Sequence, residues 1–194
     1  MKSYLTDEAP QQLVSKFIFN AVAPRPIAWI TTVSKEGVVN LAPFSFYNAI
    51  TTKPPLLMVS IGKRKDGSLK DTAKNVLESK EFVVNVVSRE FLEKVHLSGK
   101  DYPSSVSEAR ELGVELEPSL KVAPPRVKGV PAAMECVVEE FFHLGSTPML
   151  VVVGRVVAFH YREELLESQK GLVGRLGGKR YCVVENEIDL SHLS

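Results

Sequence analysis

The order of strand-forming segments constrains this chain more than any other feature. Two long runs rich in β-branched and aromatic residues, AAMECVVEEFFHLG and PMLVVVGRVVAFHY, follow one another, and the shorter runs LLMVSI and EFVVNVVS precede them. Such residues favour β-strands, and turn signals join most of the runs, with a few helical segments inserted. Strand–helix–strand alternation, which a parallel sheet needs, is not sustained. The sequence therefore predicts a mainly β protein built as a closed or nearly closed antiparallel barrel.

The length of the chain favours one structural unit. A chain of 194 residues can bury a hydrophobic core as one domain but is small for two. We expect a single domain over residues 1–194, with a folded core at about residues 20–186 and a short lead-in before it. The proline-rich stretch LEPSLKVAPPRVKGVP is expected to wrap around this domain rather than pack into it.

Charge and hydropathy argue against several partners. The net charge of +1 gives no sign of a surface for nucleic acid. No signal peptide is expected at the N-terminus, and no apolar run of about 20 residues predicts a membrane span. Cys136 and Cys182 each lie in an apolar, strand-like run. Such cysteines are typical of buried thiols in a reducing compartment, which favours the cytoplasm, and the sequence does not decide whether they meet.

Several common catalytic motifs are missing from the sequence. No G-x-G-x-x-G follows a strand, and the segment GLVGRLGGKR departs from a P-loop at Val173 and Arg180. No H-E-x-x-H or paired C-x-x-C occurs and the four histidines are scattered, so no metal site is predicted. The lack of G-x-S-x-G argues against a hydrolase.

The segment around Ser68 has the composition of a phosphate site. Ser68 and Asp71 have the S-x-x-D spacing of a capping box, which predicts that a helix begins there. A helix N-terminus offers free backbone N–H groups and a positive potential. Arg64, Lys70 and the hydroxyls of Ser68 and Thr72 would add donors for an anion. The alternative is an ordinary capped surface helix with solvated lysines.

The segment NLAPFSFYNAI combines aromatic and polar side chains. A planar ligand needs apolar walls with a few donors and acceptors at its edge, and here aromatic residues surround Ser45 and Asn48, with Asn40 nearby. The alternative is an aromatic-rich barrel core. The hydroxyls of Thr31 and Thr32 either face a ligand or only suit a strand.

Several segments, taken in order, resemble the flavin reductase-like family of FMN-binding split barrels. They are RPIAWITTVSKEGVVNLAPFSFYNAITTKPPLLMVSI, KDTAKN, EFVVNVVS, VVVGRVVAFH and GRLGGKRYCVV, and they span roughly Pro24 to Val184. The resemblance implies an antiparallel, Greek-key-like split β-barrel with FMN as cofactor. The family includes flavin reductases, reductase components of two-component monooxygenases and flavoredoxin-like electron carriers. The patterns APFSFYNAI and LKDT are most similar to the flavoredoxin-type branch.

The resemblance also implies which residues contact the cofactor. The isoalloxazine ring and ribityl chain would be lined by Thr31, Thr32, Asn40, Ser45, Phe46, Tyr47 and Asn48. The chain toward the phosphate would follow Ser60 and Gly62, and the phosphate would be held by Arg64, Lys70, Asp71 and Thr72. Arg175 and Tyr181, in an R-x-G-G-x-x-Y ending, would shape the pocket or a dimer interface.

The implied function is flavin chemistry in a homodimer. The flavin would take hydride from NAD(P)H and pass electrons to free flavin, oxygen or a redox protein, with no side chain required as acid or base. His143, at a hairpin end, is either structural or reaches the flavin of a partner subunit. The alternatives are a flavoredoxin-like electron carrier that does not oxidise NAD(P)H and a non-enzymatic barrel for another planar ligand.

Overall fold

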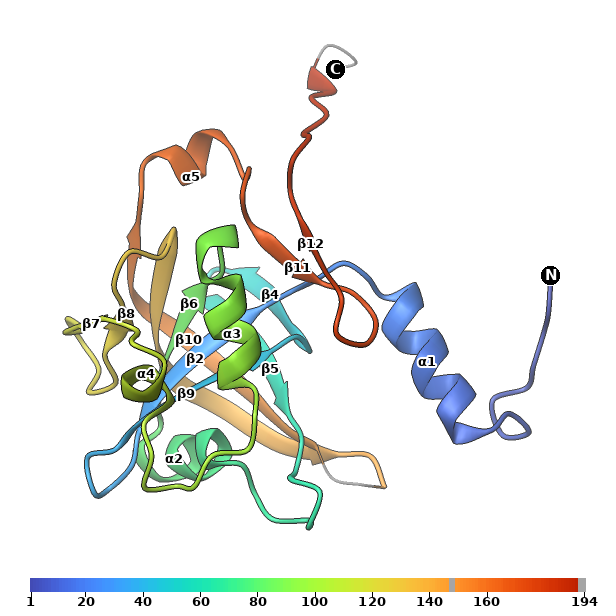
Figure 1. Ribbon diagram of the computed structural model, residues 1–194, viewed down its shortest axis with the longest axis horizontal. Helices are drawn as coiled ribbons and strands as arrows, with labels where there is room; N and C mark the ends of the chain where they lie inside the picture. The colour runs from blue at the N-terminus through green and yellow to red at the C-terminus, as the bar shows by residue number, and fades with distance from the viewer. Residues whose placement is uncertain (147–148, 192–194) are drawn as a thin grey trace.

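A curled antiparallel sheet forms the centre of the computed structural model, which describes residues 1–146 and 149–191 (Figure 1). Seven strands pair in the order β3-β2-β6-β9-β10-β5-β4. They are β2 (Ala28–Val33), β3 (Val39–Phe44), β4 (Tyr47–Thr52), β5 (Pro55–Ile61), β6 (Glu81–Val86), β9 (Ala132–Leu144) and β10 (Met149–Tyr161). All neighbours pair antiparallel, which confirms the predicted mainly β, antiparallel architecture.

The link between β3 and β4 explains why the sheet curls. These strands lie at opposite ends of the sheet order, yet only Ser45 and Phe46 separate them in the chain. Neighbouring strands are about 4.8 Å apart, so two residues cannot span a flat sheet of this width. The short link therefore holds the two edges together and gives the sheet the shape of a barrel.

Smaller elements cover this sheet. A second sheet has the order β1-β11-β12, and β7 pairs with β8. These strands are β1 (Arg25–Pro26), β7 (Leu116–Glu117), β8 (Arg126–Val127), β11 (Val173–Arg175) and β12 (Tyr181–Val183). The helices are α1 (Gln11–Ala21), α2 (Asp71–Ser79), the 3₁₀ turn η1 (Arg89–Phe91), α3 (Leu92–Ser98), α4 (Glu108–Glu111) and α5 (Glu164–Glu167). Among the described residues, no helix has the length and apolar character needed to cross a membrane.

Strand β2 is buried on both faces because the core has two parts. Ala28 and Ile30 belong to one cluster, whereas Trp29 belongs to the other, as expected when successive strand residues point to opposite faces. The Trp29 indole N–H donates to the hydroxyl of Ser98 at 2.9 Å. This bond satisfies the one polar atom of a fully buried ring and fixes the end of α3 against the barrel.

Gly154 marks the bend in the long strand β10. The pairing of β10 with β9 shifts between Val153 and Gly154. A Cβ at position 154 would lie 2.3 Å from Cζ of Phe82. Only glycine therefore lets the bent strand pass the buried Phe82 ring.

The N-terminal segment and the start of α2 differ from the sequence predictions. The expected lead-in contains helix α1, none of whose residues is buried, and Figure 1 shows it standing away from the barrel. The predicted capping box is wrong: α2 begins at Asp71 after Lys70, with no side-chain cap. Ser68 instead donates to Asp66 at 2.6 Å, and Asp71 binds Arg64. Pro148, predicted to open a strand, lies outside the described residues.

Candidate functional site

Three hollows follow one another along the molecule. The central hollow, about 520 Å³, is lined by Phe19, Arg25, Ile27, Pro43, Phe44, Ser45, His96, Gly99, Lys100, Arg175, Gly178, Lys179 and Tyr181. The polar hollow, about 50 Å³, is lined by Asn40, Ala42, Pro43, Arg64, Lys70, Asp71, Thr72, Ser98, Gly99, Lys100, Asp101, Tyr102 and Glu108. The outer hollow, about 650 Å³, is lined by Val22, Pro24, Arg25, Pro26, Ser45, Phe46, Tyr47, Asn48, Met58, Ser60, Leu144, Gly145, Met149 and Val151. The central hollow shares lining residues with each of the others and so adjoins both.

Arg25 holds one wall of the central hollow in place. Its Nη1 donates to the carbonyls of Phe19 at 2.8 Å and Val22 at 2.7 Å, and its Nη2 donates to the carbonyl of Leu176 at 3.2 Å. The side chain is 5 % exposed. Burial, and then the nearby charge of Arg175, lower its pKa. One guanidinium thus ties the end of α1 to the loop that follows β11.

A hydrogen-bonded group of three side chains forms another wall. Tyr181 Oη accepts a hydrogen bond from Arg175 and lies 3.0 Å from Nδ1 of His96. The phenol accepts from Arg175 and keeps its own proton, so it donates to Nδ1 of His96 in the tautomer whose proton is on Nε2. Burial raises the pKa of Tyr181, while the Arg175 charge opposes that shift. The phenol therefore stays protonated at neutral pH.

The polar hollow brings charged residues to the start of α2. Arg64 pairs with Asp71, and Asp71 also accepts from Ser104 at 2.7 Å. The ammonium of Lys70 lies 5.6 Å from the centre of the Phe44 ring. These contacts leave cationic groups at the rim of a hollow that also contains the Thr72 hydroxyl.

A buried carboxyl closes the floor of the polar hollow. Glu108 accepts from the backbone N–H of Leu41 at 2.8 Å, and burial raises its pKa. The side-chain amide of Asn40 lies 2.9 Å from the Thr72 hydroxyl, and its nitrogen faces Glu108 at 3.2 Å. Asn40 thereby links the carboxyl to the first turn of α2.

The outer hollow is formed around the link between β3 and β4. The Phe46 ring stacks on Phe19 with centroids 5.6 Å apart, and its carbonyl accepts from the N–H of Ser60 at 2.8 Å. Burial raises the pKa of Tyr47 to about 12. The Asn48 side chain binds the backbone N–H of Ala49 at 2.8 Å. Apolar side chains dominate the remaining lining.

The structure divides the predicted cofactor residues into groups. It brings Asn40, Arg64, Lys70, Asp71 and Thr72 together at the polar hollow. It brings Ser45, Phe46, Tyr47, Asn48 and Ser60 together at the outer hollow, and Ser45 also faces the central one. The predicted ring-binding segment therefore extends past both sides of the central hollow.

Thr31 and Thr32 do not reach any of these hollows with their side chains. Both are fully buried. The Thr31 hydroxyl donates to the carbonyl of Pro125 at 2.5 Å, and the Thr32 hydroxyl accepts from Asn75 at 2.9 Å. The interpretation in which these threonines only serve a strand fits this placement, because their hydroxyls satisfy other buried groups.

Gly62 and His143 are not lining residues of the three hollows, although each neighbours a residue that lines the outer hollow. Gly62 packs near Met149, whose Cε would lie 3.4 Å from a Cβ at position 62. His143 is exposed on β9, opposite Leu150 and beside Leu144 of the outer hollow. The predicted contact of His143 with a partner's flavin stays a prediction.

Sequence reasoning missed several lining residues. Arg25 stands between two prolines, a setting that carries no recognisable site motif. His96, Lys100 and Glu108 come from helical segments with no recognisable motif, and the fold alone brings them to the site. Lys179 follows the glycine pair of the C-terminal ending, for which only Arg175 and Tyr181 were predicted to shape the pocket or a dimer interface.

Comparisons with known proteins agree on one family. The family model described as a flavin reductase like domain matches residues 21–177. An uncharacterized protein of Aquifex aeolicus is 37% identical over 194 residues, covering 96% of this chain and 98% of that protein. Nitrilotriacetate monooxygenase component B from Bacillus cereus superposes with a TM-score of 0.89 at 33% identity, covering 98% of each chain. A Shewanella frigidimarina structure named for a flavin reductase with split barrel domain has a TM-score of 0.83 at 19% identity, covering 98% of each chain, which shows the shared split-barrel fold.

Proposed function

The chain belongs to the flavin reductase-like family, and on this premise we propose that it binds FMN and uses NAD(P)H to reduce it. A bound flavin supplies the chemistry of hydride and electron transfer, while the protein binds and orients it. The observation that carries the proposal is that the polar and central hollows adjoin, since Pro43, Gly99 and Lys100 line both. A donor set suited to a phosphate therefore lies next to a wall suited to a planar ring.

The polar hollow fits the phosphate end of FMN. Arg64 and Lys70 offer positive charge, and Thr72 offers a hydroxyl in the first turn of α2, where free backbone N–H groups also favour an anion. Three carboxyls line the same hollow: Asp71, Asp101 and Glu108. Asp71 is paired with Arg64, Asp101 is exposed to solvent, and burial raises the pKa of Glu108.

The central hollow fits the ring system. Its volume of about 520 Å³ lies within the range of small-molecule sites. Phe44 and Tyr181 offer aromatic surface, and Ser45 offers a hydroxyl at the wall that leads to the outer hollow. The phenol of Tyr181 is held in place by its hydrogen bond from Arg175, so its ring offers a fixed wall to a ligand.

The phosphate assignment is tested with the double variant Arg64→Ala, Lys70→Ala. Wild-type protein is expected to bind FMN more tightly than riboflavin, which lacks the phosphate. Loss of two charged donors should weaken FMN binding by about 100-fold and leave riboflavin binding nearly unchanged. Fluorescence titration measures both affinities.

Lys53→Ala serves as the control, because Lys53 is exposed and lines none of the hollows described above. A thermal melt of each variant shows whether the fold is intact. Equal weakening of FMN and riboflavin binding, or no change in either, would show that the phosphate binds elsewhere.

Stopped-flow mixing of the FMN-loaded protein with NADH and with NADPH tests the reductase activity. Bleaching of the flavin absorbance by either nucleotide supports the proposal. A yellow protein that neither nucleotide bleaches would instead be an electron carrier of the flavoredoxin type. A colourless protein with no affinity for FMN would leave only a binder of another planar ligand.

Supply of reduced flavin to a partner oxygenase is a second candidate function. It is favoured by the 33% identity to nitrilotriacetate monooxygenase component B over nearly the whole chain. Under this proposal the FMN-loaded protein releases reduced flavin to the medium during turnover with NAD(P)H. Retention of flavin through gel filtration after reduction would argue for oxygen or a redox protein as the acceptor.

We also propose that the chain forms a homodimer. Exposed apolar side chains on α1 and after it include Phe17 at 65%, Ile18 at 42% and Val22 at 56% exposure. An apolar row of this kind on a helix that stands away from the barrel needs a second surface to cover it. Light scattering of wild-type protein and of the Phe17→Ser variant tests the assembly, and a monomeric wild type would reject it.

A further inference from the structure

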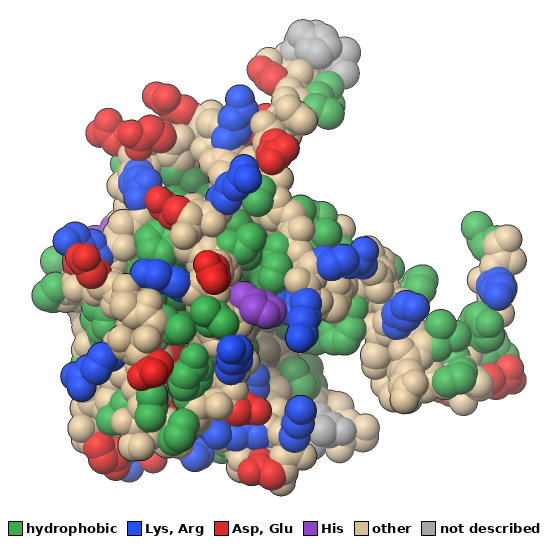
Figure 2. Space-filling view, viewed as in Figure 1, with side chains coloured by type: hydrophobic (Ala, Val, Ile, Leu, Met, Phe, Trp, Pro, Cys, Tyr) green, Lys and Arg blue, Asp and Glu red, His purple; other side chains and the backbone are tan. Residues whose placement is uncertain are grey.

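Positive charge in the central hollow has no negative counterpart. Four cationic side chains line it: Arg25, Lys100, Arg175 and Lys179. No aspartate or glutamate is among its lining residues. Within residues 1–146 and 149–191, none of the four forms an ion pair with a carboxylate. Figure 2 shows Lys and Arg side chains around the hollowed part of this face, next to a histidine.

The partners of the two arginines do not neutralise them. Arg175 donates to the Tyr181 phenol and to the carbonyl of Gly178 at 2.6 Å, and Arg25 donates to three carbonyls and approaches the Ser45 hydroxyl. The charge of Arg175 even contributes to lowering the pKa of Arg25. Two like charges held close without an anion repel each other, and a bound anion would relieve this repulsion.

The surface between these charges is apolar and aromatic. Phe44 and Tyr181 flank the hollow together with Phe19 and Pro43. The Arg175 guanidinium already lies 4.4 Å from the centre of the Tyr181 ring. A ligand for this lining combines a planar ring with a negative group, since cations placed beside aromatic walls recognise that combination.

We propose that the central hollow takes, beside the flavin, a planar second substrate that carries a phosphate or carboxylate, and that Arg175 and Lys179 bind its negative group. This inference rests on the proposed function, because it treats the second substrate as the electron donor or acceptor of the bound flavin. Lys100 lines both hollows, whereas Arg175 and Lys179 line the central one and not the polar one. The charges of Arg175 and Lys179 therefore lie outside the phosphate site formed by Arg64 and Lys70.

The test measures equilibrium binding to the FMN-loaded protein by calorimetry, with benzoate and its neutral counterpart benzamide as probes. Wild type is expected to bind benzoate about tenfold more tightly than benzamide at low salt, and the preference should shrink as salt screens the charges. Lys179→Gln and Arg175→Gln should each weaken benzoate binding by about tenfold and leave benzamide unchanged. Arg175→Lys should retain most of the preference, because it keeps the charge.

Lys170→Gln is the matched control, since Lys170 is an exposed lysine outside the central hollow. A parallel arm compares NADPH with NADH. If wild type binds NADPH more tightly than NADH and Lys179→Gln abolishes that difference, the negative group is the 2′-phosphate of the nucleotide. If Lys179→Gln weakens only benzoate binding, the negative group belongs to an aromatic acid.

Equal affinity of wild type for benzoate and benzamide would overturn the proposal. So would variants at Arg175 and Lys179 that weaken FMN binding as much as benzoate binding, because the charges would then serve the flavin itself. A wild-type protein with no affinity for FMN would instead overturn the proposed function, so the two failures are distinguishable.

Discussion

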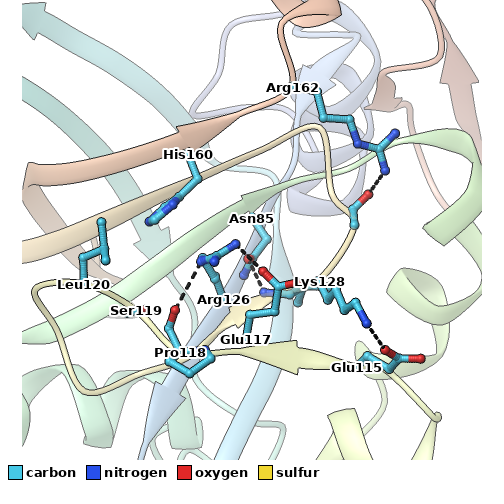
Figure 3. Close-up of polar contacts among 12 residues, drawn as sticks. Asn85, Glu115, Glu117, Pro118, Ser119, Leu120, Arg126, Lys128, His160 and Arg162 are labelled. Atoms are coloured by element: carbon cyan, nitrogen blue, oxygen red, sulfur yellow. Dashed lines mark hydrogen bonds and ion pairs between the residues drawn. The ribbon is translucent and has the colours of Figure 1, made fainter.

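The connector between α4 and β9 differs from the central hollow in how its charged side chains are paired. In the connector, residues 115–130, charged side chains meet partners: Arg126 contacts Glu117 at 2.5 Å and Lys128 contacts Glu115 at 2.8 Å (Figure 3). Beneath it the fully buried Glu135 accepts from the N–H groups of Leu120 and Lys121 and faces His160 at 2.7 Å. The central hollow has cations without carboxylates.

The difference separates charges that fix the fold from charges that remain for a ligand. A buried ion needs partners for its hydrogen bonds, and Glu135 obtains them from the connector that it holds. Removing such a group should destabilise the protein and leave ligand binding intact. Removing an unneutralised cation should have the reverse effect, and the predictions below test this contrast.

Glu135→Gln is expected to have the largest effect on stability. One amide oxygen replaces two carboxylate oxygens that accept from Leu120 at 2.7 Å and Lys121 at 2.6 Å. The free energy of unfolding should fall by about 3 kcal/mol, because buried backbone donors lose charged acceptors. Urea denaturation measures the change, and FMN affinity should stay at the wild-type value. For comparison, Glu139→Gln, at a 45% exposed carboxylate, should lose no more than about 0.5 kcal/mol.

The effect of Glu135 should depend on pH in one direction. Burial alone would raise its pKa, but the hydrogen bonds from Leu120, His160 and Lys121 outweigh burial and lower the pKa below the ordinary 4.5. A carboxyl with a lowered folded pKa stabilises the fold above its unfolded pKa and loses that contribution as pH falls through the folded value. The gap between wild type and Glu135→Gln should be complete near about pH 6 and narrow below about pH 4. A gap that widens in acid would contradict this.

Asn85→Ala should rank second. Asn85 is fully buried, donates to the carbonyl of Trp29 at 2.9 Å and accepts from the N–H of Val127 at 2.8 Å. Its loss leaves both backbone groups without these partners, so stability should fall by about 2 kcal/mol. Hydrogen exchange at Val127 provides a local measurement, and faster exchange there with unchanged FMN binding is expected. Exchange as slow as in wild type would show that the connector does not depend on Asn85.

Local patterns made much of the barrel predictable. The long runs that became β9 and β10 have the composition of strands, and their pairing follows from the few residues that separate the two runs in the sequence. The connector was harder, because its prolines suggest a segment that only wraps. In the structure Val122, Val127 and Val130 of the connector are buried in a core cluster, so this segment packs into the domain. Nothing local to that segment indicates that Glu135, a charged residue within a strand, would hold it down.

The candidate site was predictable where neighbours in sequence are neighbours in space. Arg64, Lys70, Asp71 and Thr72 lie close together for that reason, even though the capping box that first suggested them is absent. The central hollow was not predictable in this way. Arg25 reaches it from β1, Lys100 follows α3, Arg175 ends β11 and Lys179 lies between β11 and β12. Only the closed fold brings such distant segments together.

Arg126→Gln should have a modest effect within the connector. Arg126 binds Glu117 and donates to the carbonyl of Pro118 at 3.2 Å, and its side chain is 26% exposed. Because solvent screens the pair, stability should fall by only about 1 kcal/mol. Thermal unfolding of Arg126→Gln and Arg126→Lys measures how much Arg126 contributes to stability. The lysine variant should recover part of the loss, because it keeps the positive charge beside Glu117. A loss as large as that of Glu135→Gln would mean that the connector depends on its surface pair rather than on the buried carboxylate.

Lys179→Gln should have the smallest effect on stability and mark the other side of the comparison. Lys179 is exposed at the central hollow, where it shares the lining with Arg25 and Arg175 and with no carboxylate. Removing its charge takes away repulsion and breaks no ion pair, so the free energy of unfolding should stay within about 0.5 kcal/mol of wild type and move toward greater stability. Denaturation at low and high salt tests the sign, because screening should erase the small gain. A loss of stability that grows at low salt would show that Lys179 has an attractive partner. The contrast between the paired charges of the connector and the unpaired cations of the central hollow would then not hold.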